Sequence, residues 1–181
     1  MDFKYVNEKN LIFPACPENA LGIISKKVAD RLVALHLKLA TAESCTGGLV
    51  AKTLTDLPGS STFFEYGIVS YSNRIKNKML GVDEKILSEL GAVSPEVAVM
   101  MAKGARHNSD ADIGIGITGV AGPGPDGEKA EGEIYVSIST NSGEYVGHLH
   151  TDTENQREYN RNVSALNALH LVLLYLDNEL N

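Results

Sequence analysis

Ser44 is the strongest candidate for a catalytic nucleophile in this sequence. It lies in the turn Glu43-Ser44-Cys45-Thr46-Gly47-Gly48, between a strand-like run and a run with helical periodicity. A serine at such a turn is close to the unpaired N–H groups and the positive dipole end of the helix, where an oxyanion is stabilised. The segment admits two interpretations: a nucleophile turn, or a turn in which Ser44 or Thr46 caps the following helix.

A serine nucleophile needs a base, and Lys76 is the candidate. Tyr71-Ser72-Asn73-Arg74-Ile75-Lys76 leaves a predicted strand and enters a predicted helix, so its polar side chains could gather at the sheet edge that holds Ser44. Burial and a helix dipole would lower the Lys76 pKa from about 10.4 towards neutrality. The alternative is a solvated surface lysine. The histidines fall at helix ends, in the last helix or in a hairpin, and are unpromising as bases.

Three other features of the sequence bear on binding or catalysis. Gly114-Ile115-Gly116-Ile117-Thr118-Gly119 matches the dinucleotide fingerprint, but its glycines lie within a predicted strand and prolines follow, so we predict no dinucleotide site. Thr118-Gly119-Val120-Ala121-Gly122-Pro123 instead predicts a glycine loop whose backbone approaches a ligand closely. Cys45 is a rival nucleophile if the helix start lowers its thiol pKa, and a small buried thiol otherwise.

Composition excludes several classes of protein. The 181 residues, 43% hydrophobic and 22% charged, fit one globular domain. A net charge of -7 disfavours nucleic-acid and anionic membrane partners, which need a basic surface. The two cysteines suggest neither a disulfide framework nor a zinc site. His148, His150 and Asp152 alternate on one strand face, but an exposed face is commoner than a metal site.

Without a readable signal peptide or membrane span, we expect a cytoplasmic protein.

Predicted strands and helices alternate along the chain. Ser94-Pro95-Glu96 indicates a helix start, with a capping serine, a proline at the first helical position and an acid near the positive dipole end. A hairpin around Asn141-Ser142-Gly143 adds antiparallel strands. We predict an α/β fold, a three-layer α/β/α sandwich with a central mixed sheet. The predicted strands are 37–42, 63–71, 112–118, 133–140 and 144–150; the predicted helices are 20–36, 73–80 and 94–107, with others starting near 47 and 156.

The domain organisation is simple. Prolines at positions 14 and 17 disfavour a regular element, so residues 1–19 are predicted to form an extended amino-terminal arm. Residues 20–181 are predicted to form a single domain.

These same residues resemble the C-terminal domain of the competence/damage-inducible CinA family, which includes stand-alone nicotinamide-mononucleotide deamidases. The resemblance extends in order from about residue 20 to the last helix. Its motifs are Thr41-Ala42-Glu43-Ser44-Cys45-Thr46-Gly47-Gly48, Pro58-Gly59-Ser60-Ser61, Phe64-Glu65, Tyr71-Ser72-Asn73 with Lys76, Leu80-Gly81-Val82, Gly91-Ala92-Val93-Ser94 and Thr118-Gly119-Val120-Ala121-Gly122-Pro123.

The resemblance implies a serine amidohydrolase that converts nicotinamide mononucleotide to nicotinate mononucleotide and ammonia in pyridine-nucleotide recycling. It implies no metal or organic cofactor, and we expect a homo-oligomer. By position, Ser44 is the nucleophile, Lys76 the base and Tyr71 a catalytic hydrogen-bonding group. The implied substrate-binding residues are Glu43, Thr46, Gly47, Gly48, Asn73, Thr118, Gly119, Lys129, Arg157 and Arg161.

Two details of this assignment concern charge. Arg157 and Arg161 are four residues apart, on one helical face suited to a phosphate. We further expect backbone N–H groups near Thr46 and Gly47 to hold the oxyanion.

The sequence also departs from the family pattern. Lys129 is kept, but Ala130-Glu131 stands where relatives usually have Pro-Val, and Asn155-Gln156-Arg157 where they tend to have Gly-Asp-Arg. Both departures fall in segments that the resemblance assigns to substrate binding. One alternative to the amidase is therefore a nucleotide-binding paralogue whose turnover is weakened by these changes. A second alternative, which rests on Cys45 itself, is a Cys45-dependent redox or thiol enzyme.

Overall fold

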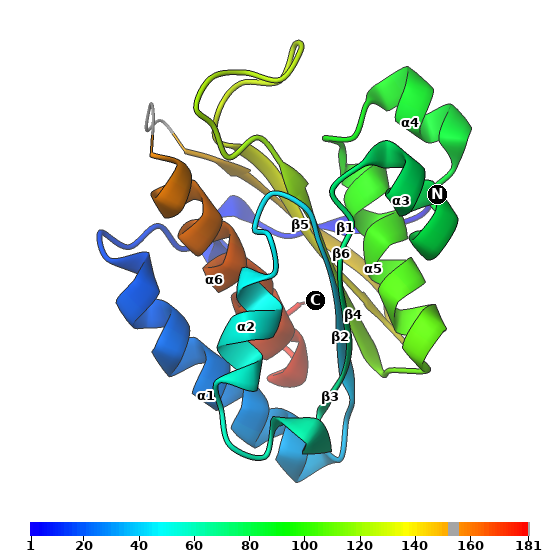
Figure 1. Ribbon diagram of the computed structural model, residues 1–181. Coiled ribbons are helices and arrows are strands. Elements are labelled where there is room, and N and C mark those ends of the chain that lie inside the picture. Colours follow the sequence, from blue (N-terminus) through cyan, green and yellow to red (C-terminus); the bar gives the residue numbers. More distant parts are fainter. Residues whose placement is uncertain (152–155, 181) are drawn as a thin grey trace.

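A six-stranded sheet forms the centre of the computed structural model, which describes residues 1–151 and 156–180 (Figure 1). The strand order is β1-β6-β5-β4-β2-β3. β2 is parallel to β3 and β4, whereas β5 is antiparallel to both of its neighbours, so the predicted mixed sheet is confirmed. The strands are β1 (Lys4–Tyr5), β2 (Leu39–Glu43), β3 (Phe64–Val69), β4 (Ile113–Gly119), β5 (Glu133–Thr140) and β6 (Gly143–His150).

Helices lie on both sides of this sheet, which confirms the three-layer sandwich (Figure 1). One side holds α1 (Pro17–Leu35), α2 (Leu49–Thr55) and α6 (Arg157–Leu176). The other side holds α3 (Asn73–Leu80), α4 (Glu84–Leu90) and α5 (Pro95–Ser109). Short 3₁₀ turns lie at Glu8–Asn10 and Ser60–Thr62.

The alternation of isoleucine and glycine in β4 explains how the layers meet. Its three isoleucines are buried in the large apolar core that includes α1 and α6 residues. Two of its glycines face α5: a Cβ at Gly114 would lie 2.1 Å from the Ala102 carbonyl oxygen, and one at Gly116 equally close to that of Ala98. The glycines that imitate a dinucleotide fingerprint therefore let a helix lie directly on a strand.

The amino-terminal segment differs from the predicted arm. Lys4 and Tyr5 form β1, which pairs in parallel with β6 at the sheet edge. The Asn167 side chain on α6 accepts a hydrogen bond from the Ile12 N–H (2.9 Å) and donates one to the Ile12 carbonyl (2.8 Å). α1 begins at Pro17 rather than near residue 20, because proline suits the first helical position. The segment is thus integrated into the fold.

Other boundaries follow local capping. Ser94 accepts a hydrogen bond from the Val97 N–H (3.3 Å), and the predicted start of α5 at Pro95 is confirmed. α3 spans the predicted 73–80, capped by Ser72. The short helix α4, capped by Asp83, was not predicted; only one of its residues is buried, so its periodic signal is weak. The predicted positions Asp152 and Asn155 lie outside the described residues.

The topology brings distant segments to one edge. β2 lies between β3 and β4 and is parallel to both, so the carboxyl ends of the three strands lie together. Ser44 directly follows β2, and the segment that begins at Ser70 directly follows β3. The glycine-rich loop leaves β4 at the same edge.

Candidate active site

A serine–lysine pair lies at this edge. The Lys76 Nζ is 3.0 Å from the Ser44 Oγ, within hydrogen-bond distance, and 2.8 Å from the Ser70 carbonyl oxygen, to which it donates. Lys76 is 1% exposed and Ser44 is 8% exposed. The interpretation of Lys76 as a solvated surface lysine is therefore wrong, and nucleophile and base candidates are in direct contact.

Burial changes the acidity of this lysine. It lowers the pKa of the Lys76 ammonium from 10.5 to about 8, because an apolar surrounding disfavours the charged form; the nearby Cys45 opposes this shift. Within the described chain, no carboxylate forms an ion pair with Lys76. Near pH 8, about half of the Lys76 side chains would be neutral amines that can accept a proton.

Glu43, the residue before the nucleophile candidate, points its side chain towards α2 and not into the cavity beside Ser44. Its buried carboxylate accepts hydrogen bonds from the N–H groups of Val50 (3.1 Å) and Ala51 (2.8 Å) at the start of α2. The helix start, with its free donors and positive dipole end, compensates the buried negative charge. Glu43 therefore fixes α2 to the end of β2 and does not line the cavity beside Ser44.

The turn itself depends on two glycines in the left-handed region. Gly47 has φ +65° and Gly48 has φ +92°. The Gly47 N–H donates to the Ser44 carbonyl (3.0 Å) and closes the turn, so it is not available to an oxyanion. In the part of the chain that the structure describes, no backbone carbonyl accepts from the N–H of Cys45 or Thr46. These two N–H groups directly follow Ser44 in the chain, and both also interact with the Cys45 thiol.

Cys45 is an unfavourable nucleophile in this position. Burial raises the pKa of its thiol to about 12, and the N–H groups of Cys45 and Thr46 and the charge of Lys76 offset this only in part. The thiolate is the reactive form of cysteine. The geometry thus agrees with a small buried thiol next to the serine.

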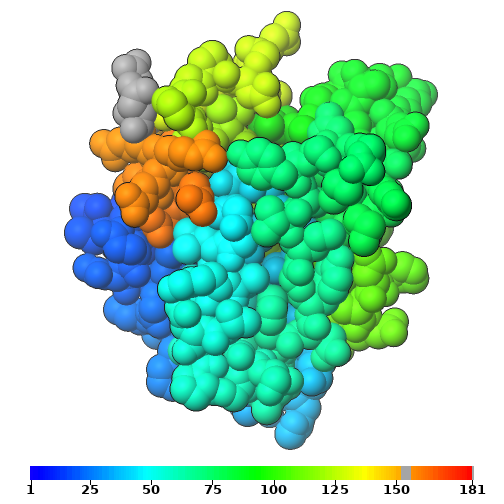
Figure 2. Space-filling view, in the orientation of Figure 1, coloured from blue at the N-terminus to red at the C-terminus, as the bar shows by residue number. Residues whose placement is uncertain are grey.

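A cavity of about 720 Å³ opens over the pair. Figure 2 shows the glycine-rich loop (yellow-green) beside the start of α6 (orange), with α3 and α4 (green) across from them. The sequence-predicted residues that line it are Ser44, Tyr71, Asn73, Lys76, Thr118, Gly119, Lys129 and Arg157. The predicted residues outside its lining are Glu43, Thr46, Gly47, Gly48 and Arg161.

The lining residues have protein partners in this structure. The Tyr71 hydroxyl, on a residue that is 64% exposed, accepts a hydrogen bond from the Arg157 Nη2 (3.3 Å) and, in the described structure, forms no hydrogen bond with Ser44. The Arg157 Nη1 donates to the Gly122 carbonyl in the loop. The Thr118 hydroxyl donates to the Ala92 carbonyl (2.7 Å). Arg157 therefore bridges two sides of the cavity mouth.

Lys129 and Arg161 also have partners, in different places. The Lys129 Nζ pairs with the Glu133 carboxylate at 2.8 Å, on the cavity side of the loop. The Arg161 guanidinium donates to the Thr46 carbonyl from both Nε (3.1 Å) and Nη2 (2.7 Å). The two arginines predicted to share one phosphate thus have separate partners.

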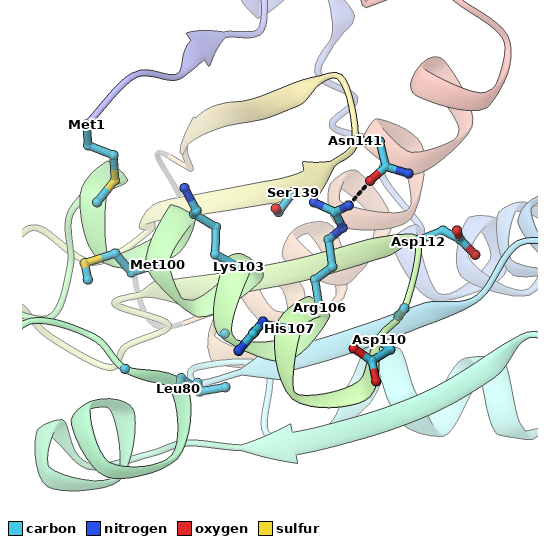
Figure 3. A pocket seen from close by; sticks show the side chains of 13 residues that line it. Met1, Leu80, Met100, Lys103, Arg106, His107, Asp110, Asp112, Ser139 and Asn141 are labelled. Atoms are coloured by element: carbon cyan, nitrogen blue, oxygen red, sulfur yellow. Dashed lines mark hydrogen bonds between the residues drawn. The ribbon is translucent and has the colours of Figure 1, made fainter.

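A second cavity, of about 730 Å³, lies along the carboxyl-terminal half of α5 (Figure 3). Its Arg106 donates to the Thr140 carbonyl (2.9 Å) and to Asn141, and its Lys103 pairs with Glu144 at 3.4 Å. Ser139 is the hydroxyl side chain among its lining residues, and no base contacts it in the described structure. The chemistry is therefore concentrated at the Ser44–Lys76 pair.

Sequence reasoning missed two features of the site. The Ser70 carbonyl orients Lys76, but a backbone acceptor leaves no signal in residue type. Glu131 accepts a hydrogen bond from the Gly124 N–H (2.7 Å) and packs against Gly122, where a Cβ would lie 2.2 Å from its carboxyl carbon. The departure at Ala130-Glu131 was the available signal for this loop contact.

Fold and site together define an α/β protein with a buried serine–lysine pair at the carboxyl edge of a mixed sheet. A sequence profile of the CinA C-terminal domain matches residues 22–176, and the chain belongs to this family. It is 43% identical over 154 residues to a CinA-like protein of Desulfotalea psychrophila, covering 84% of this chain and 37% of that protein. It is 48% identical over 145 residues to a putative competence-damage inducible protein of Moorella thermoacetica, covering 78% and 34%. The chain thus spans about a third of these relatives.

Solved structures agree with this family assignment. The competence/damage inducible protein CihA from Agrobacterium tumefaciens has a TM-score of 0.82 and 33% identity, covering 92% of this chain and 98% of that one. A CinA superfamily protein from Escherichia coli has a TM-score of 0.82 and 30% identity, covering 94% and 99%. Among the described residues, no helix is both long enough and apolar enough to cross a membrane.

Proposed function

We propose that this chain is a nicotinamide-nucleotide amidase that hydrolyses nicotinamide mononucleotide to nicotinate mononucleotide and ammonia in pyridine-nucleotide recycling. The observation that carries the proposal is the 3.0 Å separation of two buried groups, the Lys76 Nζ and the Ser44 Oγ. The family resemblance supports the choice of substrate. The cavity of about 720 Å³ falls in the usual size range of small-molecule sites.

The first half of the reaction forms an acyl-enzyme. The Lys76 Nζ donates to the Ser70 carbonyl and lies 3.0 Å from the Ser44 Oγ, so once it is neutral it can accept the proton of the Ser44 hydroxyl across that contact. As the Ser44 Oγ attacks the carboxamide carbon, its proton passes to Lys76. The carbonyl oxygen becomes an oxyanion, which the Cys45 and Thr46 N–H groups stabilise. Lys76 then returns the proton to the departing nitrogen, and ammonia leaves.

The second half releases the acid. Neutral Lys76 takes a proton from a water molecule as the water oxygen attacks the ester carbon, and then gives it to the Ser44 Oγ as the ester bond breaks. Nicotinate mononucleotide leaves and the free serine is restored. Arg157, which lines the cavity, is the cation that we assign to the substrate phosphate.

Ammonia release from nicotinamide mononucleotide tests this proposal. Ser44→Ala and Lys76→Met are each expected to lower kcat by about 100-fold or more, because each removes a member of the proton-transfer pair. Cys45→Ser is the matched control, since its thiol is protonated and is expected to change kcat by less than about tenfold. Equal rates in wild type and Ser44→Ala would refute a serine mechanism, and a selective loss in Cys45→Ser would favour the thiol enzyme.

The second candidate is a nucleotide-binding paralogue with weakened turnover. The observation that favours it is the altered loop, in which Glu131 binds the Gly124 N–H where relatives usually have Val. Calorimetric binding of the mononucleotide without ammonia release would support this candidate.

We also propose a homo-oligomer in the cytoplasm that needs no metal. Light scattering tests the oligomeric state, and unchanged activity in a chelator tests the independence from metal.

A further inference from the structure

The Arg161 guanidinium contacts the nucleophile turn. Its Nε and Nη2 both donate to the carbonyl oxygen of Thr46, at 3.1 and 2.7 Å. Thr46 is completely buried. Hydrogen bonds from a charged donor are stronger than neutral ones, and two on one oxygen restrict its position. Arg161 therefore holds one end of the peptide unit that joins Thr46 to Gly47.

The other end of this peptide unit holds the serine. The Gly47 N–H donates to the Ser44 carbonyl at 3.0 Å. A continuous series of hydrogen bonds thus runs from the guanidinium through the Thr46–Gly47 peptide to the backbone of Ser44. A donor that polarises the Thr46 carbonyl also strengthens the hydrogen bond of the Gly47 N–H.

Gly47 itself is fitted to this arrangement. Its φ of +65° is a conformation that L side chains rarely adopt, and a Cβ would lie 3.2 Å from the Arg161 Nη2. Glycine therefore satisfies two needs at once: the turn geometry and the close approach of the guanidinium.

Arg157, one helical turn earlier, has a different environment. It lines the cavity and contacts the Tyr71 hydroxyl and the Gly122 carbonyl at the mouth. Arg161 does not line the cavity. Equal spacing on α6 gave both arginines the same predicted role, but the structure separates them.

We infer that Arg161 is a positioning residue that fixes the Ser44 turn through the Thr46–Gly47 peptide, and is not a ligand of the substrate phosphate. This inference rests on the proposed function for its substrate, but not for its geometry. Loss of the guanidinium would leave the phosphate site intact and displace the Ser44 Oγ from Lys76. A misplacement on the ångström scale can cost about 100-fold in rate.

Steady-state kinetics with two substrates separate the two roles. We would compare nicotinamide mononucleotide with its dephosphorylated nucleoside in wild type, Arg161→Gln, Arg161→Lys and the matched control Arg157→Gln. Arg161→Gln is expected to lower kcat about 10- to 100-fold for both substrates, with KM changed less than about threefold. Arg161→Lys should recover part of kcat, since an ammonium can still donate to the Thr46 carbonyl. Arg157→Gln should raise KM for the phosphorylated substrate alone.

The rate at which a fluorophosphonate labels Ser44 tests the inference without reference to the natural substrate. Labelling in Arg161→Gln should slow about 10-fold or more, while its melting temperature shows that it is folded. If wild type is labelled but releases no ammonia, slower labelling still supports the positioning role although the proposed function fails. Equal labelling of wild type and variant, a KM effect confined to the phosphorylated substrate, or an unlabelled wild type would each overturn it.

Discussion

At the scale of single residues, the charge state of Lys76 depends on where Glu43 points. The Glu43 carboxylate directs both oxygens to N–H groups at the start of α2. Had it faced Lys76, the opposite charge would have raised the pKa of the amine and removed its capacity to act as a base. The Lys76 contacts are instead neutral oxygens of Ser44 and Ser70. The start of α2 thus compensates the buried charge of Glu43. The Lys76 ammonium has no such partner and loses its proton more readily.

The pH dependence of catalysis follows from this pKa. Because the neutral amine is the base, kcat/KM for the amidase reaction should rise about tenfold per pH unit below pH 8 and level off above it. A pH–rate profile from 6 to 10 measures this, with circular dichroism at each pH as the control for unfolding. A flat profile, or an apparent pKa near 10.5, would contradict the assignment of Lys76.

The same pKa predicts a stability cost. Lowering the Lys76 pKa from 10.5 to about 8 corresponds to about 3 kcal/mol of the free energy of unfolding. This cost is present in full below pH 8, where Lys76 is charged in both the folded and the unfolded chain. Between pH 8 and 10.5 the unfolded chain binds more protons, so stability rises with pH. Lys76→Met removes this cost but also loses two hydrogen bonds. Its free energy of unfolding at pH 7 should therefore exceed that of wild type by about 1 to 2 kcal/mol.

Urea unfolding at several pH values checks this expectation. The advantage of Lys76→Met over wild type should shrink steadily as pH rises from 8 to 10.5, because only wild type carries the titrating group. Lys26→Met is the control, since Lys26 is an exposed side chain on α1. A constant difference between Lys76→Met and wild type across this range would show that burial of the charge is not the cause.

At the scale of elements, the contact between α5 and β4 sets the position of the strand end that lines the cavity. Gly116→Ala would place a Cβ 2.1 Å from the Ala98 carbonyl oxygen, and backbone must move. We expect a loss of about 2 to 4 kcal/mol in the free energy of unfolding. Gly22→Ala on α1, with open space around it, should be neutral or stabilising by up to about 1 kcal/mol. Similar effects in both variants, measured by urea unfolding, would contradict this packing argument.

The loop over the cavity is held by a hydrogen bond from the Gly124 N–H to the Glu131 carboxylate. Glu131→Val removes the acceptor of the Gly124 N–H, so hydrogen exchange at this amide should accelerate about tenfold or more. Global stability should change by less than about 1 kcal/mol, because a buried carboxylate oxygen without a partner in the described structure is removed as well. Glu131→Gln keeps an acceptor and should retain most of the protection. Equal exchange in all three proteins would exclude a holding role for Glu131.

Local signals predicted elements well where they were strong. The Ser94-Pro95-Glu96 start gave α5 correctly, and alternation of strands and helices gave the three layers. The brief α4 and the two-residue β1 were missed, because neither carries enough buried residues for a periodic pattern. The prolines at positions 14 and 17 predict an irregular segment, but Pro17 is the first residue of α1, because a proline at the first helical position breaks no hydrogen bond.

At the scale of the whole molecule, the site is an assembly of segments far apart in the chain. Parallel topology was enough to predict that Ser44 and Lys76 share one sheet edge. It was not enough to separate Arg157 from Arg161, since sequence spacing gives a helix face but not the partner that each side chain reaches. Roles that depend on contacts between distant backbone segments, such as that of the Ser70 carbonyl, had no pattern to detect.

The amino-terminal segment is the clearest case of such a distant contact. Buried Asn167 on α6 holds both backbone groups of Ile12, at 2.9 and 2.8 Å, much as a neighbouring strand would. Asn167→Ala would leave these groups unpaired and should cost about 1 to 3 kcal/mol. The first sixteen residues should then open more often and be cleaved faster by a protease, which mass spectrometry of the fragments would detect.

A matched variant on the same helix isolates the effect. The Asn162 amide donates to the Glu158 carbonyl within α6 and, among the described residues, forms no hydrogen bond with the amino-terminal segment, so Asn162→Ala should leave the cleavage rate near that of wild type. β1 pairs with β6 next to the segment that Asn167 holds, and its release should therefore also raise hydrogen exchange at Val6, whose N–H donates to the Val146 carbonyl. Equal cleavage in the two variants would mean that β1 pairing alone keeps this segment on the sheet.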